Sequence, residues 1–136
     1  MVSTAMEHAR TDRSGVGRTP KPWGYEDLWA ITGRDAGKVL HVNRGHQLSL
    51  QYHERKEETI LLYAGRLILL LEDEAGTLRE HWLEPGEARH IPVGRLHRMI
   101  AVEDCDVLEV STPELDDVVR VDDAYGRAAV PAESPS

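Results

Sequence analysis

The sequence predicts an all-β fold in a single domain, and three observations lead to it. Short apolar runs recur at intervals of roughly 8–12 residues, with Gly or Pro between them. No segment before residues 114–120 has the apolar period of a helix. The chain has 136 residues, which suits one domain with a substantial core. Together these features favour two packed sheets in a jelly-roll barrel.

The individual strands are predicted from apolar runs that turn residues bound. Two prolines beside Trp23 and Gly24 exclude a helix interior, so this stretch is expected to be an extended lead into the first long strand. The continuous apolar run at residues 67–71 is short and flanked by turn signals, which favours a buried strand over a helix. The expected strands cover residues 25–31, 38–42, 50–53, 59–63, 66–71, 78–83, 88–91, 97–102 and 107–110.

Composition divides the chain into a domain and two ends. Residues 1–19 are polar and rich in Ser, Thr, Arg and Gly, so we expect a flexible N-terminal arm, with docking onto the domain as the alternative. Residues 20–128 form the predicted domain. Residues 129–136 are expected to be a flexible C-terminal tail.

The charge and the cysteine count exclude some classes of function. The net charge is -8, which argues against nucleic acid or an anionic membrane as the main partner. No apolar run approaches the ~20 residues of a membrane span, and the N-terminus has no apolar core of a secretory signal. The single cysteine, Cys105, excludes an intrachain disulfide and suits a reducing compartment. We therefore expect a cytoplasmic protein.

Four side chains have the spacing of metal ligands. Gln51 and His53 are two residues apart, so in a strand both point to one face. Glu58 follows a short polar break and begins the next apolar run, and His97 follows a turn at residues 92–94. One amide oxygen, two imidazoles and one carboxylate suit one divalent ion such as zinc, manganese, iron, cobalt or nickel.

These residues stand in two motifs that resemble those of the cupins. The first is Gly45-x5-Gln51-x-His53-x4-Glu58-x6-Gly65, with Gln in place of the usual first His. The second is Gly86-x5-Pro92-x-Gly94-x2-His97-x3-Ala101, with Ala where many cupins carry Asn. The resemblance implies a double-stranded β-helix, the jelly-roll barrel of cupins, with one metal ion held by Gln51, His53, Glu58 and His97.

Further motifs are similar to the C-terminal domain of type II mannose-6-phosphate isomerases, over about residues 20–127. They include Pro22-Trp23-Gly24, Ser49-Leu50-Gln51 and Tyr125-Gly126-Arg127. The resemblance implies an aldose–ketose isomerase that acts on a sugar or sugar phosphate through a metal-stabilised enediolate. The chain departs from that family at Arg55, where the family has a histidine, and in a shorter loop at residues 111–115.

The isomerase hypothesis assigns roles to further side chains. Lys38, or a water held by Glu58, would move the proton as the general base. Arg55, Arg120 or Arg127 would bind the substrate phosphate. The alternative for each of these four basic residues is that it has no role in function and is a surface charge, either solvated or in an ion pair.

Two other functions stay open. His53, Glu58 and His97 are two histidines and one carboxylate, the ligand set of non-haem iron(II) enzymes that use oxygen. The chain can also be a non-catalytic cupin that binds a sugar or metabolite. In each case a homodimer is expected, since exposed sheet edges favour pairing.

Overall fold

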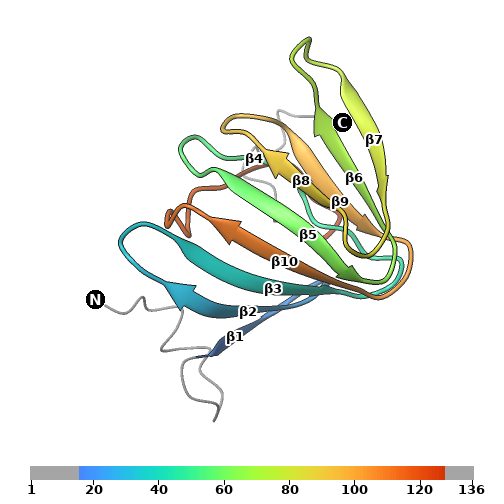
Figure 1. The fold of residues 1–136 in the computed structure, drawn as a ribbon. Helices are drawn as coiled ribbons and strands as arrows, with labels where there is room; N and C mark the ends of the chain where they lie inside the picture. The colour runs from blue at the N-terminus through green and yellow to red at the C-terminus, as the bar shows by residue number, and fades with distance from the viewer. Residues whose placement is uncertain (1–15, 128–136) are drawn as a thin grey trace.

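The computed structural model describes residues 16–127, and these residues form two antiparallel sheets without any helix (Figure 1). The six-stranded sheet has the order β1-β2-β3-β10-β5-β8, and the five-stranded sheet has the order β11-β4-β9-β6-β7. The strands are β1 (Gly17–Lys21), β2 (Gly24–Ile31), β3 (Ala36–Val42), β4 (Leu50–Tyr52), β5 (Glu58–Ala64), β6 (Leu67–Glu72), β7 (Leu78–Leu83), β8 (Ala88–Ile91), β9 (His97–Ala101), β10 (Cys105–Ser111) and β11 (Val119–Asp122). Within residues 16–127 nothing resembles a membrane-crossing helix.

This architecture confirms the predicted all-β single domain of jelly-roll type, with two corrections. Residues 114–120 do not form a helix, because a turn at residues 115–116 leads directly into β11. The boundary predicted at residue 20 is too late, because β1 begins at Gly17 and pairs with β2. The rest of the predicted arm, residues 1–15, and the predicted tail, residues 129–136, lie outside the described residues.

The core lies between the two sheets. Alternate residues of each strand point inward, so the apolar residues of one sheet meet those of the other. From the six-stranded sheet come Leu40, Val42, Ile60, Leu62 and Val107, and from the five-stranded sheet Leu67, Leu69 and Met99, all at most 2% exposed. Burying each such side chain contributes roughly 1.5–3 kcal/mol, which makes this apolar layer the main source of stability.

One end of the barrel interior is charged instead of apolar. Lys38 on β3, Glu58 on β5 and Glu109 on β10 have the same inward parity as the apolar residues further along their strands. The register places Glu109 directly opposite Lys38 on one side and Ile60 on the other. All three charged side chains are at most 7% exposed. The strand register therefore gathers buried charge at one end of the barrel.

The C-terminal segment packs against this charged end. The strand β11 pairs with β4, and beyond it the hydroxyl of Tyr125 lies 2.6 Å from Nδ1 of His46. The two rings are also stacked, with centroids 5.9 Å apart. Upstream, the carboxylate of Asp117 accepts hydrogen bonds from the backbone N–H groups of residues 54, 55 and 56. These contacts hold residues 117–125 along the barrel.

Candidate metal centre

His53, Glu58 and His97 come together inside the charged end of the barrel. One ligand atom from each of the three lies within 4.8 Å of the others. The three residues are only 3%, 3% and 1% exposed. They come from the residue after β4, the start of β5 and the start of β9, as the two sequence motifs require. The backbone N–H of Gly94 in the second motif donates to the carbonyl of His53, which ties the motifs together.

Backbone carbonyls orient both imidazole rings. Nδ1 of His53 lies 2.5 Å from the carbonyl oxygen of Asp117, and Nδ1 of His97 lies 2.9 Å from that of Arg95. A carbonyl oxygen only accepts, so each Nδ1 must carry the proton. In its neutral form such a ring turns its Nε2 lone pair towards the cluster, where a metal ion could accept it. This is the arrangement that metal-binding histidines adopt in proteins.

The inward-facing atoms of the cluster lack hydrogen-bond partners. Nε2 of His53 lies 3.7 Å from Oε1 of Glu58, and Nε2 of His97 lies 3.4 Å from Oε2. Both Nε2 atoms are buried without a hydrogen bond to any residue in the range 16–127, and Oε1 of Glu58 has only its ion pair with Lys56 there. Buried polar atoms of this kind are rare because they are costly. A divalent cation would satisfy all three, so the residues present fit a metal ion.

Gln51 lies beside this cluster. Its Cα partner across the β4–β9 pairing is His97, so the two side chains share one face of the sheet. Its Oε1 accepts a hydrogen bond from Oγ of Ser49 at 2.5 Å. Its place agrees with a fourth donor, and its role as a ligand stays a prediction.

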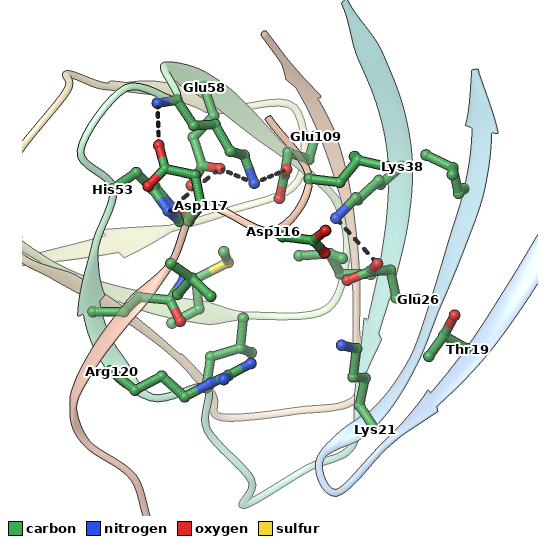
Figure 2. A pocket seen from close by; sticks show the side chains of 18 of the residues that line it. Thr19, Lys21, Glu26, Lys38, His53, Glu58, Glu109, Asp116, Asp117 and Arg120 are labelled. Atoms are coloured by element: carbon green, nitrogen blue, oxygen red, sulfur yellow. Dashed lines mark hydrogen bonds and ion pairs between the residues drawn. The ribbon is translucent and has the colours of Figure 1, made fainter. Parts of the chain in front are cut away.

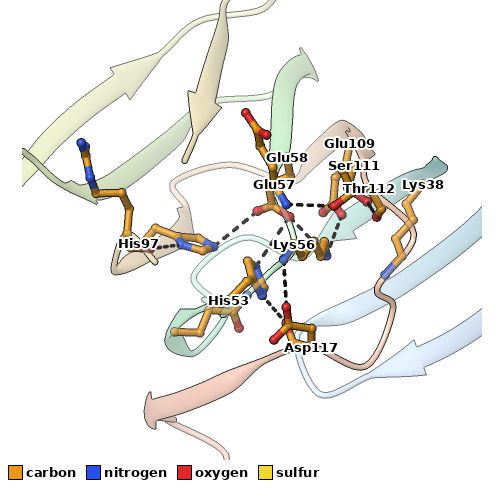
Figure 3. A network of polar contacts seen from close by, with 12 residues as sticks. Lys38, His53, Lys56, Glu57, Glu58, His97, Glu109, Ser111, Thr112 and Asp117 are labelled. Carbon is orange, nitrogen blue, oxygen red and sulfur yellow. Dashed lines mark hydrogen bonds and ion pairs between the residues drawn. The ribbon is translucent and has the colours of Figure 1, made fainter. Parts of the chain in front are cut away.

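Lys56 and Glu109 extend the cluster into a buried charge network, shown in Figure 3. Nζ of Lys56 lies 3.2 Å from Oε1 of Glu58 and 3.1 Å from Oε2 of Glu109. Burial lowers the pKa of Lys56, but the two carboxylates raise it more, so it stays protonated. Burial and the charge of Glu58 raise the pKa of Glu109, which Lys56 and Lys38 offset only in part.

The carboxylate of Glu58 is held ionised. Its burial would raise its pKa, but His53, His97 and Lys56 around it hold that pKa well below the ordinary value. Glu58 and Glu109 supply two buried carboxyl groups for the single ammonium of Lys56 between them. This excess of acidic groups favours binding a cation.

The network opens into a cavity of about 180 Å³ between the two sheets, shown in Figure 2. Gln51, His53, Glu58 and Glu109 line its inner part. Lys38 also lines it, and its ammonium lies 3.0 Å from Oε2 of Glu26. The lining also includes apolar side chains such as Trp23, Leu40 and Met99, so a ligand in this cavity would meet both charged and apolar groups.

The predicted arginines separate into two groups. Arg120 and Arg127 line the cavity, whereas Arg55 is exposed and does not. The strand β4 ends at Tyr52, so the strand parity that would turn Arg55 inward does not continue to it. Arg98 donates to the carbonyl of Leu48 and is absent from the lining, as its parity opposite to His97 predicts.

Two residues of the site were missed from the sequence alone. Glu109 has the inward parity of Val107 in a predicted strand, so strand alternation could have identified it. Lys56 lies in a polar turn between strands, where lysines are usually solvated, but it is only 5% exposed. The sequence of such a turn has no periodic pattern that would indicate whether the Lys56 side chain points inward or outward.

Comparison of the sequence with curated proteins finds similar bacterial proteins. No protein-family model matches the chain. The alginate biosynthesis protein AlgA of Pseudomonas putida is 30% identical over 138 residues, covering 98% of this chain and 27% of AlgA. The mannose-1-phosphate guanylyltransferase ManC of Salmonella typhimurium is 32% identical over 112 residues, covering 79% of this chain and 22% of ManC. The chain therefore spans about a quarter of the length of these relatives.

Solved structures identify the fold. Oxalate decarboxylase from Bacillus subtilis superposes with a TM-score of 0.71 at 18% identity, over 79% of this chain and 30% of that one. KdgF from Halomonas sp. superposes with a TM-score of 0.60 at 22% identity, over 79% of this chain and 88% of that one. The chain has the cupin fold. This cupin is similar in sequence to parts of AlgA and ManC, which confirms the resemblance seen in its motifs.

Proposed function

We propose that this cupin is a metal-dependent isomerase that interconverts the aldose and ketose forms of a small sugar or sugar phosphate. The observation that carries the proposal is the buried set of His53, Glu58 and His97 beside a polar cavity. The names of the relatives, alginate biosynthesis protein and mannose-1-phosphate guanylyltransferase, support a sugar substrate.

The size of the cavity supports a small substrate. Its volume is about 180 Å³. A protein cavity of about 150 Å³ already admits one six-membered ring. The enclosed part of a ligand is therefore about one monosaccharide unit, and a polysaccharide chain would not fit inside.

His53, Glu58 and His97 would hold the metal ion, with Gln51 as the fourth donor. Zinc, manganese, iron, cobalt and nickel all suit this donor set. A bound divalent ion supplies Lewis-acid stabilisation of negative charge on substrate oxygen atoms. The protein's own contribution is to fix both rings through the carbonyls of Asp117 and Arg95 and to exclude bulk water by burial.

Proton transfer between two substrate carbons needs a general base in the cavity. Lys38 is engaged by Glu26 at 3.0 Å, and Glu58 belongs to the ligand set. Glu109 lines the cavity outside that set, and burial and the charge of Glu58 raise its pKa above that of an ordinary glutamate, which makes it a stronger base. We therefore place Glu109 first as the base, before the sequence-based choices Lys38 and Glu58.

The first test is metal content followed by substrate exchange. Purified wild type and His97→Ala are compared by elemental analysis, with His81→Ala on β7 as the matched control. We expect stoichiometric metal in wild type and control, and loss in His97→Ala. Exchange of solvent deuterium at C1 and C2 of a panel of sugars and sugar phosphates is then followed by NMR. A wild type that cannot be loaded with metal contradicts the proposal.

A second function is favoured by the ligand chemistry itself. Two histidines and one carboxylate, as found in the cluster, are the ligands of non-haem iron(II) enzymes. Oxygen consumption by the iron-loaded protein with a carbon substrate would favour this alternative. Metal and sugar binding without turnover would instead indicate a binding protein.

We also propose a homodimer in the cytoplasm. The exposed Trp29, Tyr63 and Val110 on strands of the six-stranded sheet support a pairing surface. The unpaired thiol of Cys105 supports a reducing compartment. Light scattering of the purified protein would test the dimer.

A further inference from the structure

The loop between two of the candidate metal ligands is bonded along its whole length to a distant part of the chain. Residues 54–57 connect His53 to Glu58, so the shape of this loop sets how far apart the two ligands lie. The carboxylate of Asp117 accepts hydrogen bonds from the backbone N–H groups of residues 54, 55 and 56, at 3.0, 2.6 and 2.8 Å. The backbone N–H of Glu57 donates to Oγ1 of Thr112, and the N–H of Thr112 donates to the carbonyl of Glu57.

Asp117 also holds the ring of His53. Its backbone carbonyl accepts a hydrogen bond from Nδ1 of His53 at 2.5 Å. Figure 3 shows Asp117 beside both His53 and the backbone of Lys56. One residue therefore fixes the imidazole through its main chain and the loop to Glu58 through its side chain.

The two candidate histidine ligands differ in what holds them. Nδ1 of His97 donates to the carbonyl of Arg95, two residues earlier in the same segment. The acceptor for His53 lies 64 residues further along the chain. The ring of His97 is thus held locally, whereas the ring of His53 depends on the C-terminal part of the chain being in place.

That part of the chain, residues 112–125, is called the C-terminal strap below. Its residues 115–118 line the cavity, and β11 within it pairs with β4. At its far end the hydroxyl of Tyr125 lies 2.6 Å from Nδ1 of His46. The strap is therefore a wall of the cavity and is joined to the barrel at both ends by polar contacts. Water can replace such contacts, so the strap can leave the barrel at a lower cost in free energy than a core strand.

The bond pattern at residues 54–56 suits a carboxylate and no neutral group. Successive backbone N–H groups that point to one place form an anion-binding nest. Hydrogen bonds to an ionised carboxylate are stronger than those to a neutral acceptor. The side chain of Asp117 is therefore well suited to hold the loop against the strap.

We propose that Asp117 is a positioning residue that makes metal binding at the candidate centre depend on packing of the C-terminal strap. With the strap packed, the His53 ring and the loop to Glu58 are fixed and the cavity has its wall. With the strap released, His53 loses the acceptor that orients its ring. Coupling between two equilibria is reciprocal, so metal binding must in turn stabilise the packed strap. This inference rests on the proposed function and adds the element that completes its metal centre.

The first test is the Co²⁺ affinity of the full chain at pH 7, measured by competition with a chelator. Asp117→Asn keeps the backbone carbonyl and the size of the side chain, but its amide has one acceptor oxygen for three N–H groups. We expect the affinity to fall roughly 10- to 100-fold, as is typical when a residue that orients a metal ligand is changed. Thr112→Val, which frees only the N–H of Glu57, should lower it less.

The matched control is Asp104→Asn. The carboxylate of Asp104 also accepts a backbone N–H from a distant residue, Arg44, but it lies outside the cavity lining. This variant should bind Co²⁺ as tightly as wild type. Unfolding curves check that each variant is folded.

The second test distinguishes positioning from a general loss of stability. In the metal-free protein, nitrogen NMR of labelled histidines at pH 8 reports which ring nitrogen carries the proton. We expect the Nδ1–H form for both His53 and His97 in wild type, because both rings donate to carbonyls. In Asp117→Asn the ring of His53 should become a mixture of both forms, while that of His97 stays unchanged. A purely structural role would not separate the two rings.

The third test needs no variant. Addition of Co²⁺ to wild type should slow amide hydrogen exchange in β11, although no residue of β11 is a candidate ligand. Exchange in β7, at the far edge of the same sheet, should not change. Equal exchange in β11 with and without Co²⁺ overturns the inference. So does wild-type Co²⁺ affinity in both Asp117→Asn and Thr112→Val.

The same data separate this inference from the proposed function. If wild type exchanges deuterium into a sugar but Asp117→Asn binds Co²⁺ as wild type does, the isomerase stands and the role of the strap is wrong. If Co²⁺ binding depends on Asp117 but no sugar exchanges deuterium, the role of the strap stands and the isomerase is wrong. A wild type that binds no metal contradicts both.

Discussion

Nζ of Lys56 lies 3.2 Å from Oε1 of Glu58, and both side chains are almost completely buried. The same ammonium reaches Glu109 on β10, so one lysine connects the turn after His53 to two strands of the six-stranded sheet. Removing one partner of such a pair leaves an uncompensated charge in the interior.

Lys56→Met should therefore lower the free energy of unfolding of the metal-free protein by about 3–5 kcal/mol, measured with urea. The double variant Lys56→Met/Glu109→Gln should recover part of this loss, because one of the two orphaned carboxylates is gone. Arg66→Met, which breaks an exposed pair, should cost less than about 1 kcal/mol. If the losses in free energy of unfolding of Lys56→Met and Glu109→Gln simply add in the double variant, the two residues are not coupled and the prediction is contradicted.

The lowered pKa of Asp117 predicts that the free energy of unfolding depends on pH in the acid range. Burial raises the pKa of Asp117, but three backbone N–H donors lower it more, so the net shift is downward. Its ionised form therefore stabilises the fold above its unfolded pKa of about 4, and this contribution disappears as pH falls through the lower folded pKa. Asp117→Asn should cost about 1 kcal/mol at pH 7. In unfolding curves measured between pH 7 and pH 3, the difference in free energy of unfolding between Asp117→Asn and wild type should become smaller only below about pH 4.

Gln51→Ala should weaken metal binding less than His97→Ala does. Oε1 of Gln51 already accepts a hydrogen bond from Ser49, whereas Nε2 of His97 has no partner. We expect a loss of roughly 10- to 100-fold for Gln51→Ala, the size typical of residues that support a metal site. Competition with a chelator measures both affinities, and an equal loss in the two variants would make Gln51 a full ligand.

Cys105 should react slowly with alkylating reagents in the folded protein. It is fully buried, and burial raises the pKa of its thiol to about 11. The neutral thiol is thus favoured in the fold, and its stabilising contribution falls as pH rises from about 8.5, the pKa of a free thiol, towards 11. Iodoacetamide at pH 8 should label the protein in urea much faster than without it. Comparable rates would mean that Cys105 is accessible.

Gly65→Ala should destabilise the turn between β5 and β6. Its φ is +96°, and a Cβ there would lie 2.2 Å from the carbonyl oxygen of Asp104. Strain and clash together should cost about 2 kcal/mol or more. Gly76→Ala is the matched control, since its φ is +87° and its nearest contact is 3.9 Å away. Gly76→Ala should lower the free energy of unfolding by only about 1 kcal/mol. Equal losses in the two variants would show that the clash with Asp104 does not contribute.

The strands and the candidate metal ligands could be predicted from the sequence because apolar runs, turn residues and motifs mark them. Turn glycines such as Gly65 and apolar runs such as that of β6 predicted the strands, and two motifs predicted the meeting of His53, Glu58 and His97.

The rest depended on irregular backbone. Arg55 and Lys56 are adjacent in a turn where strand alternation no longer applies, so the sequence left both roles of Arg55 open and gave no sign that Lys56 is the buried one. Lys21 becomes part of the cavity only because β1 begins at Gly17 and pairs with β2, in a stretch whose polar composition indicated a loose arm. Tertiary pairing of this kind leaves no local signal in the sequence.

The charged residues of the cavity lining produce an electric field inside the cavity. Glu58 and Glu109 lie on one side of the cavity and Lys21 and Arg120 on another, and this arrangement sets up a field along the cavity. An uncharged ligand is not oriented by this field and can bind either way round. A ligand with one charged end would be aligned before it touches the innermost residues, so each encounter would begin with the same end first.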